Sequence, residues 1–378
     1  MPRQTPGNSS SASSRKILKE LCSVPTAPFA EARVIGFVES FVGARRRLQL
    51  TRDVFGNLLI QIPAGARRRA SGKKRRRWVF TAHMDHPGFI AGKMLDPRTL
   101  EADFYGGVSP EYFPGSRVKF FDADEEIRAS VINYRTAKDG RANGATLRVS
   151  KPVASGTPGM WDQGEGKFAG RRFLSRVCDD LAGAAAALAM LDALAKKPAK
   201  IDVAVLLTRA EEEGFIGAVA ASLKPRLLRK TDRVIAIECS SVQPYAPQGG
   251  GAIIRVGDRT SVFNSSLSYF LTQVATDLGA ADKTFKYQRA LMPGGTCEAT
   301  VYDIYGFIAA SICVPLGNYH NMDKSKKKIA PEYIDVGDWD SMVKLFIELA
   351  RRGHEYEPGH GALKAKVKAR FDKMKHML

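Results

Sequence analysis

The sequence has few cysteines, and they show no spacing that marks a disulfide framework or a zinc knuckle. Its 378 residues contain five, an odd number, which favours reduced thiols in a cytoplasm. The longest apolar run, AGAAAALAMLDALA (182–195), is too short and interrupted to cross a bilayer. The opening stretch, MPRQTPGNSSSASSRK, lacks the apolar core of a signal peptide. We therefore expect a cytoplasmic protein that is not a membrane protein.

Acidic residues are fewer than basic ones. The sequence has 39 Asp and Glu and 58 Lys and Arg, which gives a net charge of +19. Such an excess can mark a nucleic-acid-binding protein. No helix-turn-helix or series of stacking aromatic residues accompanies it, and charge alone gives only non-specific binding. We therefore expect solvated loops and a basic tail, and do not expect nucleic acid as a partner. The basic clusters are Arg45–Arg47, Arg67–Arg69, Lys73–Arg77, Lys326–Lys328 and the tail from Lys364.

The order of the predicted elements divides the chain into two kinds of structure. Short alternating strands broken by Gly and Pro follow Gly88, which predicts a small all-β module. Strand and helix patterns alternate from Asp179 onward, ending in a closing helix over EYIDVGDWDSMVKLFIELARR (332–352). This alternation predicts an α/β fold with a mixed, largely parallel sheet flanked by helices, into which the β module is inserted.

Four segments follow from this division. They are a disordered leader (1–14), a discontinuous α/β domain (15–87 and 166–357), an inserted β-barrel-like domain (88–165) and a basic tail (358–378).

Histidines and carboxylates stand where the predicted strands end or where a helix begins. Because active sites of open α/β sheets gather at the carboxyl ends of the strands, we expect these side chains to converge. Each alone has an ordinary explanation, such as an N-cap or a solvated turn, but all fall at one edge of the predicted sheet. They are His83, Asp85 and His86 after WVFTA, Asp179 and Asp180 before a long helix, Glu211–Glu213 after VAVLLT, Glu238 after RVIAI, and His320 after SICVPLGNY.

Two histidines with several carboxylates form a ligand set that suits a pair of divalent ions, with zinc first and cobalt or manganese as alternatives. Two ions held close together need a shared carboxylate, and Asp179 suits that role because a helix N-terminus favours its charged form. The His-x-Asp spacing predicts that His83 binds metal while Asp85 orients it.

Six motifs resemble a known family over most of the chain, from about Ile17 to Arg352. The family is that of the di-zinc aminopeptidases that form tetrahedral particles, the glutamyl and deblocking aminopeptidases, some of which were once labelled endoglucanases. The β module also resembles that family's inserted domain. The motifs are TAHMDHPGF, SRVCDDLAG, TRAEEEGFIGA, IAIECSS, MPGGTCEA and VPLGNYHNM.

The resemblance implies a role for each motif residue and a homo-oligomer that acts on short peptides. His83 and Glu238 would bind one zinc and Glu212 and His320 the other, with Asp179 between them and Glu211 as the general base. His86, Glu238 and Cys297 depart from the pattern, which usually has Glu, Asp and an acid there, and we place His86 and Cys297 near the substrate. The related acylases and carboxypeptidases insert their second domain between the fourth and fifth ligands, whereas here the β segment lies between His83 and Asp179.

Three functions remain open from the sequence. The first is a two-metal aminopeptidase in which Glu211 activates a metal-bridging water. The second is a two-metal amidase or deacylase of acylated small molecules. The third is a polyanion-binding protein on a decayed peptidase fold, which would bind less as salt rises.

Overall fold

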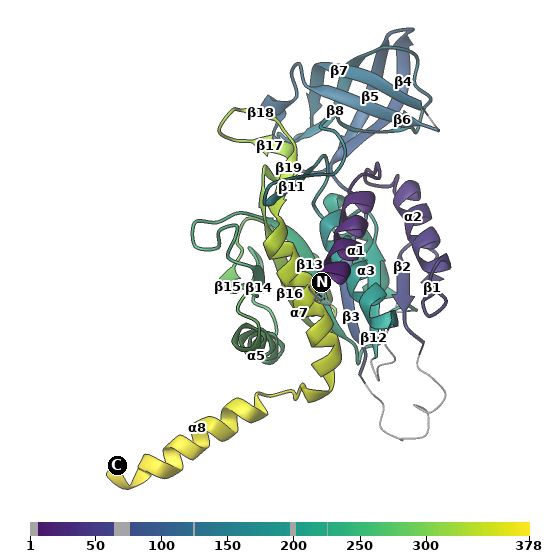
Figure 1. The fold of residues 1–378 in the computed structure, drawn as a ribbon. Coiled ribbons are helices and arrows are strands. Elements are labelled where there is room, and N and C mark those ends of the chain that lie inside the picture. The colour runs from purple at the N-terminus through teal and green to yellow at the C-terminus, as the bar shows by residue number, and fades with distance from the viewer. Residues whose placement is uncertain (1–6, 64–75, 124, 197–201, 225) are drawn as a thin grey trace, which may run out of the picture.

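The computed structural model describes residues 7–63, 76–123, 125–196, 202–224 and 226–378, which form an α/β domain carrying a separate β-barrel (Figure 1). Eleven strands make one mixed sheet in the order β1-β2-β12-β3-β13-β16-β19-β11-β10, with β14 and β15 attached beside β16. The strands are β1 (Gln49–Arg52), β2 (Leu58–Gln61), β3 (Trp78–His83), β10 (Lys167–Ala169), β11 (Arg172–Ser175), β12 (Val203–Thr208), β13 (Arg233–Ser241), β14 (Ala252–Gly257), β15 (Tyr287–Leu291), β16 (Ile308–Gly317) and β19 (Glu332–Asp335).

The predicted mixed α/β fold is confirmed. The four central strands β12, β3, β13 and β16 are parallel, whereas the hairpins at both margins run antiparallel. Their residues are apolar on both sides because helices cover both faces of the sheet. Strands β14 and β15 were not predicted from the sequence.

Alternate residues of β12 show how the two faces are filled. Val203, Val205 and Leu207 join the large core beneath α1, α2, α3, α5 and α7. Ala204 and Leu206 point the other way, into a smaller core with α4 and α6. The helices are α1 (Gly7–Leu21), α2 (Ala32–Gly43), α3 (Leu181–Lys196), α4 (Ile216–Leu223), α5 (Ser265–Ala281), α6 (Glu298–Ile304), α7 (Val336–Arg352) and α8 (Gly361–Met374).

The barrel follows β3 directly and closes in the order β4-β5-β8-β7-β6-β9. Aromatic rings fill it, with Trp161 packed against Phe89, Phe104 and Phe113 at centroid distances of 4.8–5.8 Å. The fold therefore suspends the barrel over the carboxyl ends of the parallel strands. The barrel strands are β4 (Gly88–Asp96), β5 (Thr99–Tyr105), β6 (Arg117–Asp122), β7 (Glu125–Thr136), β8 (Ala142–Val149) and β9 (Pro158–Trp161); a small pair, β17 (Met322–Asp323) and β18 (Lys328–Ile329), lies below them.

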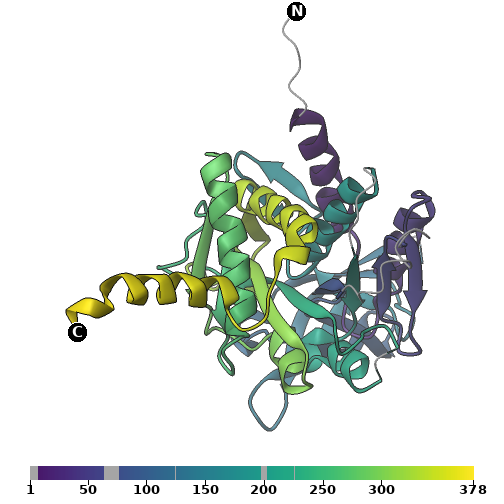
Figure 2. The ribbon, with the colours of Figure 1, turned by 90° about the horizontal axis from the view of Figure 1, so that it is seen from below.

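The ends of the described chain differ from the sequence-based expectations. Residues 7–14 of the expected disordered leader belong to α1, which extends outward from the buried Ile17, Leu18 and Leu21. The basic tail contains helix α8, which projects from the body in Figure 2. No helix among the described residues is both long and apolar enough to cross a membrane.

Two further expectations need correction. The closing helix begins at Val336 because Asp335 caps it, and the four preceding residues form strand β19 instead. Arg77 was assigned to a solvated polar loop, but it is buried and bound to the buried Asp232 at 2.6 Å. Arg76 of the same basic loop is exposed as expected, and residues 67–75 of the loop lie outside the described residues.

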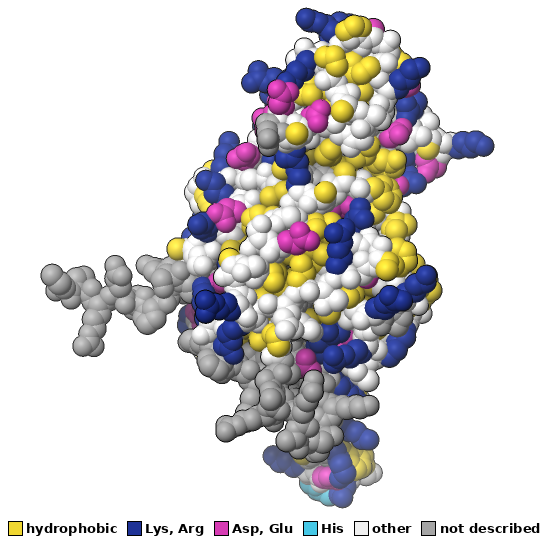
Figure 3. All heavy atoms as spheres, turned by 90° about the vertical axis from the view of Figure 1, so that its right-hand side faces the viewer, with side chains coloured by type: hydrophobic (Ala, Val, Ile, Leu, Met, Phe, Trp, Pro, Cys, Tyr) yellow, Lys and Arg dark blue, Asp and Glu magenta, His cyan; other side chains and the backbone are white. Residues whose placement is uncertain are grey.

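Basic side chains are dispersed over one face of the molecule. On the face shown in Figure 3, Lys and Arg are spread over the barrel and the α/β domain with acidic side chains among them, and they do not gather in one stripe.

Candidate metal centre

The predicted ligands come together at one edge of the sheet. His83 is the last residue of β3, and Glu238 lies in the second half of the parallel strand β13. Glu211 and Glu212 form the short 3-10 turn after β12, and His320 lies in a similar turn after β16. Asp179 stands just before α3, joined to Asp180 by a cis peptide bond. Elements distant in sequence thus meet beneath the barrel.

Two groups of potential metal ligands share Asp179. Ligand atoms of His83, Asp179 and Glu238 all lie within 4.8 Å of one another, and so do those of Asp179, Glu212 and His320. Asp179 turns one oxygen toward each histidine, with Oδ1 3.6 Å from His83 Nε2 and Oδ2 3.7 Å from His320 Nε2. The carboxylate of Asp179 is thus shared between the two groups.

Unpartnered polar atoms show that these groups fit cations. Oδ1 of Asp179, Oε1 of Glu212, Oε1 of Glu238 and Nε2 of His320 are all buried and make no hydrogen bond of good geometry, although His320 Nε2 lies 3.2 Å from Glu212 Oε1. A buried polar atom without a partner costs free energy, and a cation would satisfy all four. Burial, with a further contribution from the charge of Asp179, raises the pKa of Glu238 to about 8.

One other combination of residues in the cluster is less suited to a metal. Asp179, Asp180 and Cys239 also lie close together. The Cys239 thiol donates to the carbonyl oxygen of Cys178 at 3.4 Å, and burial and the charge of Asp180 raise its pKa well above the usual range. Because a metal binds the thiolate, this thiol is a poor ligand.

Asp85 connects His83 to the glutamate turn. His83 Nδ1 lies 3.1 Å from the Asp85 carbonyl oxygen and 3.5 Å from its Oδ1. The two carboxylate oxygens of Asp85 accept the backbone N–H groups of Glu211 and Glu212 at 3.0 and 3.1 Å. Asp85 therefore positions the turn as well as facing the imidazole, a second contact that its spacing from His83 did not predict.

The barrel side of the site orients His320. Its Nδ1 lies 2.7 Å from the carbonyl oxygen of Gly107, in the segment that leaves β5, so Nε2 is directed at Glu212 and Asp179. Asn318, His320 and Asn321 all have positive φ angles, between 54° and 63°. Residues other than glycine rarely adopt this conformation, and such strain is concentrated at functional sites.

Glu211 lies beside the ligands, with Oε2 3.8 Å from His83 Nε2. Burial raises its pKa well above the usual range, and the neighbouring His83 opposes that rise. The carboxylate therefore lies beside the candidate metal ligands and has a raised proton affinity. Both properties suit a general base.

Glu213, the third glutamate, bridges to the barrel. Its Oε1 accepts the backbone N–H of Gly106 at 2.7 Å, one residue before the carbonyl that meets His320. No role was predicted for this residue from the sequence, and it is exposed in the structure. The structure places it between the glutamate turn and the barrel segment.

Glu332 is the main site residue that the sequence did not indicate. Its buried carboxylate accepts the N–H groups of Cys178 and Asp179 on Oε2 at 2.7 and 3.0 Å, and that of His320 on Oε1 at 2.8 Å. One side chain therefore fixes both the Asp179 segment and the His320 turn. In the sequence, the only indication of this residue is an acidic side chain at the first position of a segment that was predicted to be a helix.

The two residues predicted to contact substrate lie deeper than expected. His86 Nδ1 is 2.6 Å from the carbonyl oxygen of Asp179, and its Nε2 is 3.1 Å from Asn321 Oδ1. Cys297 is buried at the start of α6, where its N–H donates to Asp258 at 2.9 Å. A cavity lies next to the candidate ligands, and neither residue is among the described residues that line it.

A cavity of about 500 Å³ adjoins the cluster beneath the barrel. Arg255 is its most notable polar side chain, since it is 3% exposed and its buried Nε has no hydrogen-bond partner. The wall includes Glu238, Tyr112 from the barrel segment, Tyr319, Gly295 and Thr296. The cavity is therefore lined by a candidate metal ligand, a buried arginine and apolar surface.

Comparisons with known proteins place the chain in a peptidase family. A model of the M42 glutamyl aminopeptidase family matches residues 65–328. A predicted aminopeptidase from Acetivibrio thermocellus is 26% identical over 309 residues, covering 78% of this chain and 86% of that protein.

Solved structures show the same fold. An aminopeptidase from the archaeon Desulfurococcus kamchatkensis aligns with a TM-score of 0.73 at 20% identity, covering 90% of this chain and 95% of that one. The TET1 peptidase of Pyrococcus horikoshii, which can assemble into a tetrahedron or a large octahedral shell, aligns with a TM-score of 0.71 at 18% identity, covering 89% of this chain and 99% of that one.

Proposed function

The chain belongs to the M42 glutamyl aminopeptidase family and is a peptidase, and we propose that it removes N-terminal residues from peptides with the help of two divalent metal ions. The observation that carries the two-metal part is Asp179, whose two oxygens face different histidines within two overlapping ligand groups.

The proposed ligands divide into two sets. His83 and Glu238 would hold one ion, Glu212 and His320 the other, and Asp179 would bind both. Zinc suits the combination of imidazole and carboxylate, and cobalt or manganese would also fit. When bound, the ions would polarise the scissile carbonyl and lower the pKa of a water molecule between them.

Glu211 supplies the proton transfer in this proposal. Its carboxylate takes a proton from the attacking water and delivers it to the nitrogen of the leaving peptide. The hydrogen bonds that the backbone N–H groups of Glu211 and Glu212 donate to Asp85 hold the turn in place during this transfer. His83 and His320 stay oriented by their contacts with Asp85 and Gly107.

The cavity favours an acidic side chain on the residue that is removed. Arg255 is a buried cation with an unpartnered Nε, and a substrate carboxylate would satisfy it. We therefore propose that glutamyl and aspartyl substrates are cleaved faster than leucyl ones. An Arg255→Met variant should lose this preference.

Assembly and location rest on a relative and on the cysteines. Since the Pyrococcus horikoshii relative forms closed particles, we propose that this chain is a homo-oligomer. All five cysteines are buried and unpaired, which favours a reducing compartment such as the cytoplasm.

The test uses a Glu211→Gln variant on aminoacyl nitroanilides. The variant should keep its metal, because Glu211 is not a proposed ligand, and lose about a hundredfold or more in kcat. Full activity with normal metal content would overturn the assignment of the base. N-acyl amino acids, tested in parallel, distinguish the alternative deacylase: preferential hydrolysis of these compounds would favour it.

A further inference from the structure

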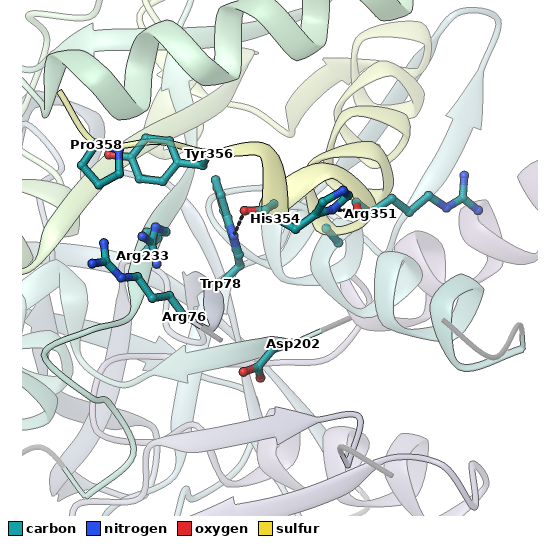
Figure 4. Close-up of a pocket in the computed structure, with 10 residues that line it drawn as sticks. Arg76, Trp78, Asp202, Arg233, Arg351, His354, Tyr356 and Pro358 are labelled. Carbon is teal, nitrogen blue, oxygen red and sulfur yellow. Dashed lines mark hydrogen bonds between the residues drawn. The ribbon is translucent and has the colours of Figure 1, made fainter. Parts of the chain in front are cut away.

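A second cavity lies at the opposite edge of the sheet from the metal centre. It has a volume of about 250 Å³ and is formed where β3 and β13 begin and α7 ends (Figure 4). Trp78 belongs to its wall and His83 ends the same strand, so five residue steps, roughly 17 Å, separate it from the centre. The described residues that line it are Arg76, Trp78, Asp202, Arg233, Ala350, Arg351, Gly353, His354, Tyr356 and Pro358.

Arg233 is a buried cation in this wall with unsatisfied hydrogen-bonding capacity. It is 3% exposed, and its Nε is buried without a partner. Among the described residues, its side chain makes one hydrogen bond, a long one of 3.5 Å from Nη1 to the carbonyl oxygen of Thr231. The neighbouring carboxylate of Asp232 is already engaged by Arg77 and by the N–H of Arg229. Within the described part of the chain, Arg233 therefore forms no ion pair.

A second guanidinium group increases the positive charge. Arg76 lies near Arg233 and repels it, and burial together with this repulsion lowers the pKa of Arg233 to about 10. Figure 4 shows both guanidinium groups on the same side of the cavity, near the ring of Tyr356. The one carboxylate among the described lining residues, Asp202, lies apart from them in that view.

Aromatic packing holds this geometry in place. Arg233 lies over the Tyr356 ring at 4.8 Å, and Trp78 packs edge-on against the same ring at 6.0 Å. The Trp78 indole N–H donates to the Gly353 carbonyl oxygen at 3.2 Å, and the Tyr356 hydroxyl bonds to Ser266 at 2.7 Å. The aromatic polar groups are thus satisfied within the protein, whereas the arginine is not.

We propose that this cavity is a binding site for a compact phosphate-type oxyanion, held between Arg233 and Arg76. Arginine side chains bind phosphate oxygens in paired, charge-assisted hydrogen bonds, which would satisfy the unpartnered Nε and relieve the repulsion between the two cations. The cavity of about 250 Å³ has room for a phosphate or a small phosphorylated molecule.

The test is isothermal titration of sodium phosphate into the metal-loaded protein at constant ionic strength. Wild type should bind one more phosphate per chain than Arg233→Gln, or bind that phosphate at least tenfold more tightly. Arg128→Gln is the matched control, since Arg128 is exposed on the barrel strand β7 and carries the same charge change. Sodium chloride at equal ionic strength should give no binding heat.

Further arms keep the outcome decisive. If Arg233→Gln fails to fold by circular dichroism, Arg76→Gln, at an exposed position, replaces it. Tighter binding of glycerol phosphate than of inorganic phosphate identifies a phosphorylated molecule as the ligand, and the reverse identifies free phosphate. The proposal fails if wild type binds no phosphate at 10 mM, or if both pocket variants bind it as wild type does. Peptidase activity is measured separately, so this failure would not bear on the proposed function.

Discussion

Replacing Glu332 with glutamine should weaken both the fold and one of the two proposed metal positions. The carboxylate accepts three backbone N–H groups, two on Oε2 and one on Oε1. A glutamine offers only one acceptor oxygen, so its NH2 group must face at least one of these donors. The variant changes little in volume, so the effect reports on hydrogen bonding.

The magnitude follows from the number of bonds affected. One buried N–H loses its acceptor, at a cost of about 1–3 kcal/mol, and the remaining bonds lose their charge assistance. We therefore expect the free energy of unfolding to fall by about 2–4 kcal/mol. If the glutamine oxygen keeps the hydrogen bond from the Asp179 N–H, the N–H of His320 loses its acceptor. Metal binding at the proposed position that uses His320 should then weaken more.

The assay combines guanidinium unfolding with competition for zinc by a chromogenic chelator. Glu39→Gln is the control, since Glu39 is exposed on α2 and far from the cluster in sequence. Unfolding within about 0.5 kcal/mol of wild type, with both zinc ions bound as in wild type, would refute the reasoning, because surface substitutions give changes of that size.

Two further predictions concern contacts beyond the ligands. Glu213→Ala removes the acceptor for the Gly106 N–H and should lower zinc affinity about threefold to tenfold by loosening the barrel segment, measured by the same chelator competition; unchanged affinity would contradict this. Asp232→Ala leaves the buried Arg77 unpaired and should cost about 3–5 kcal/mol in denaturant unfolding. Asp139→Ala, which breaks an exposed arginine pair on the barrel, should leave the unfolding midpoint unchanged, and equal losses in the two variants would refute the distinction.

The convergence of the candidate ligands could be predicted because it follows from a general property of parallel strands. His83, Glu211 and Glu238 each stand at or near the end of an apolar strand, and parallel strands present those ends at one edge. The order of strands in the sheet was not needed for that inference. Only their common direction was.

Contacts between distant segments could not be read in this way. Glu332 lies in a four-residue strand that was predicted as part of the helix that follows it. Its hydrogen bond with the N–H of Asp179 could therefore not be predicted. The contact of Gly107 with His320 depends on how the barrel is placed over the sheet, which no local pattern encodes. Arg77 belongs to a basic run in sequence, and only the fold reveals its buried partner Asp232.

The central claim is that Asp179 holds two metal ions between two ligand sets. Elemental analysis of the purified protein after zinc loading tests it most directly, with His320→Ala measured alongside wild type. We expect two zinc ions per chain in wild type and one in the variant, because the set of His83 and Glu238 remains intact. One ion or none in wild type, or the same content in both proteins, would contradict the claim.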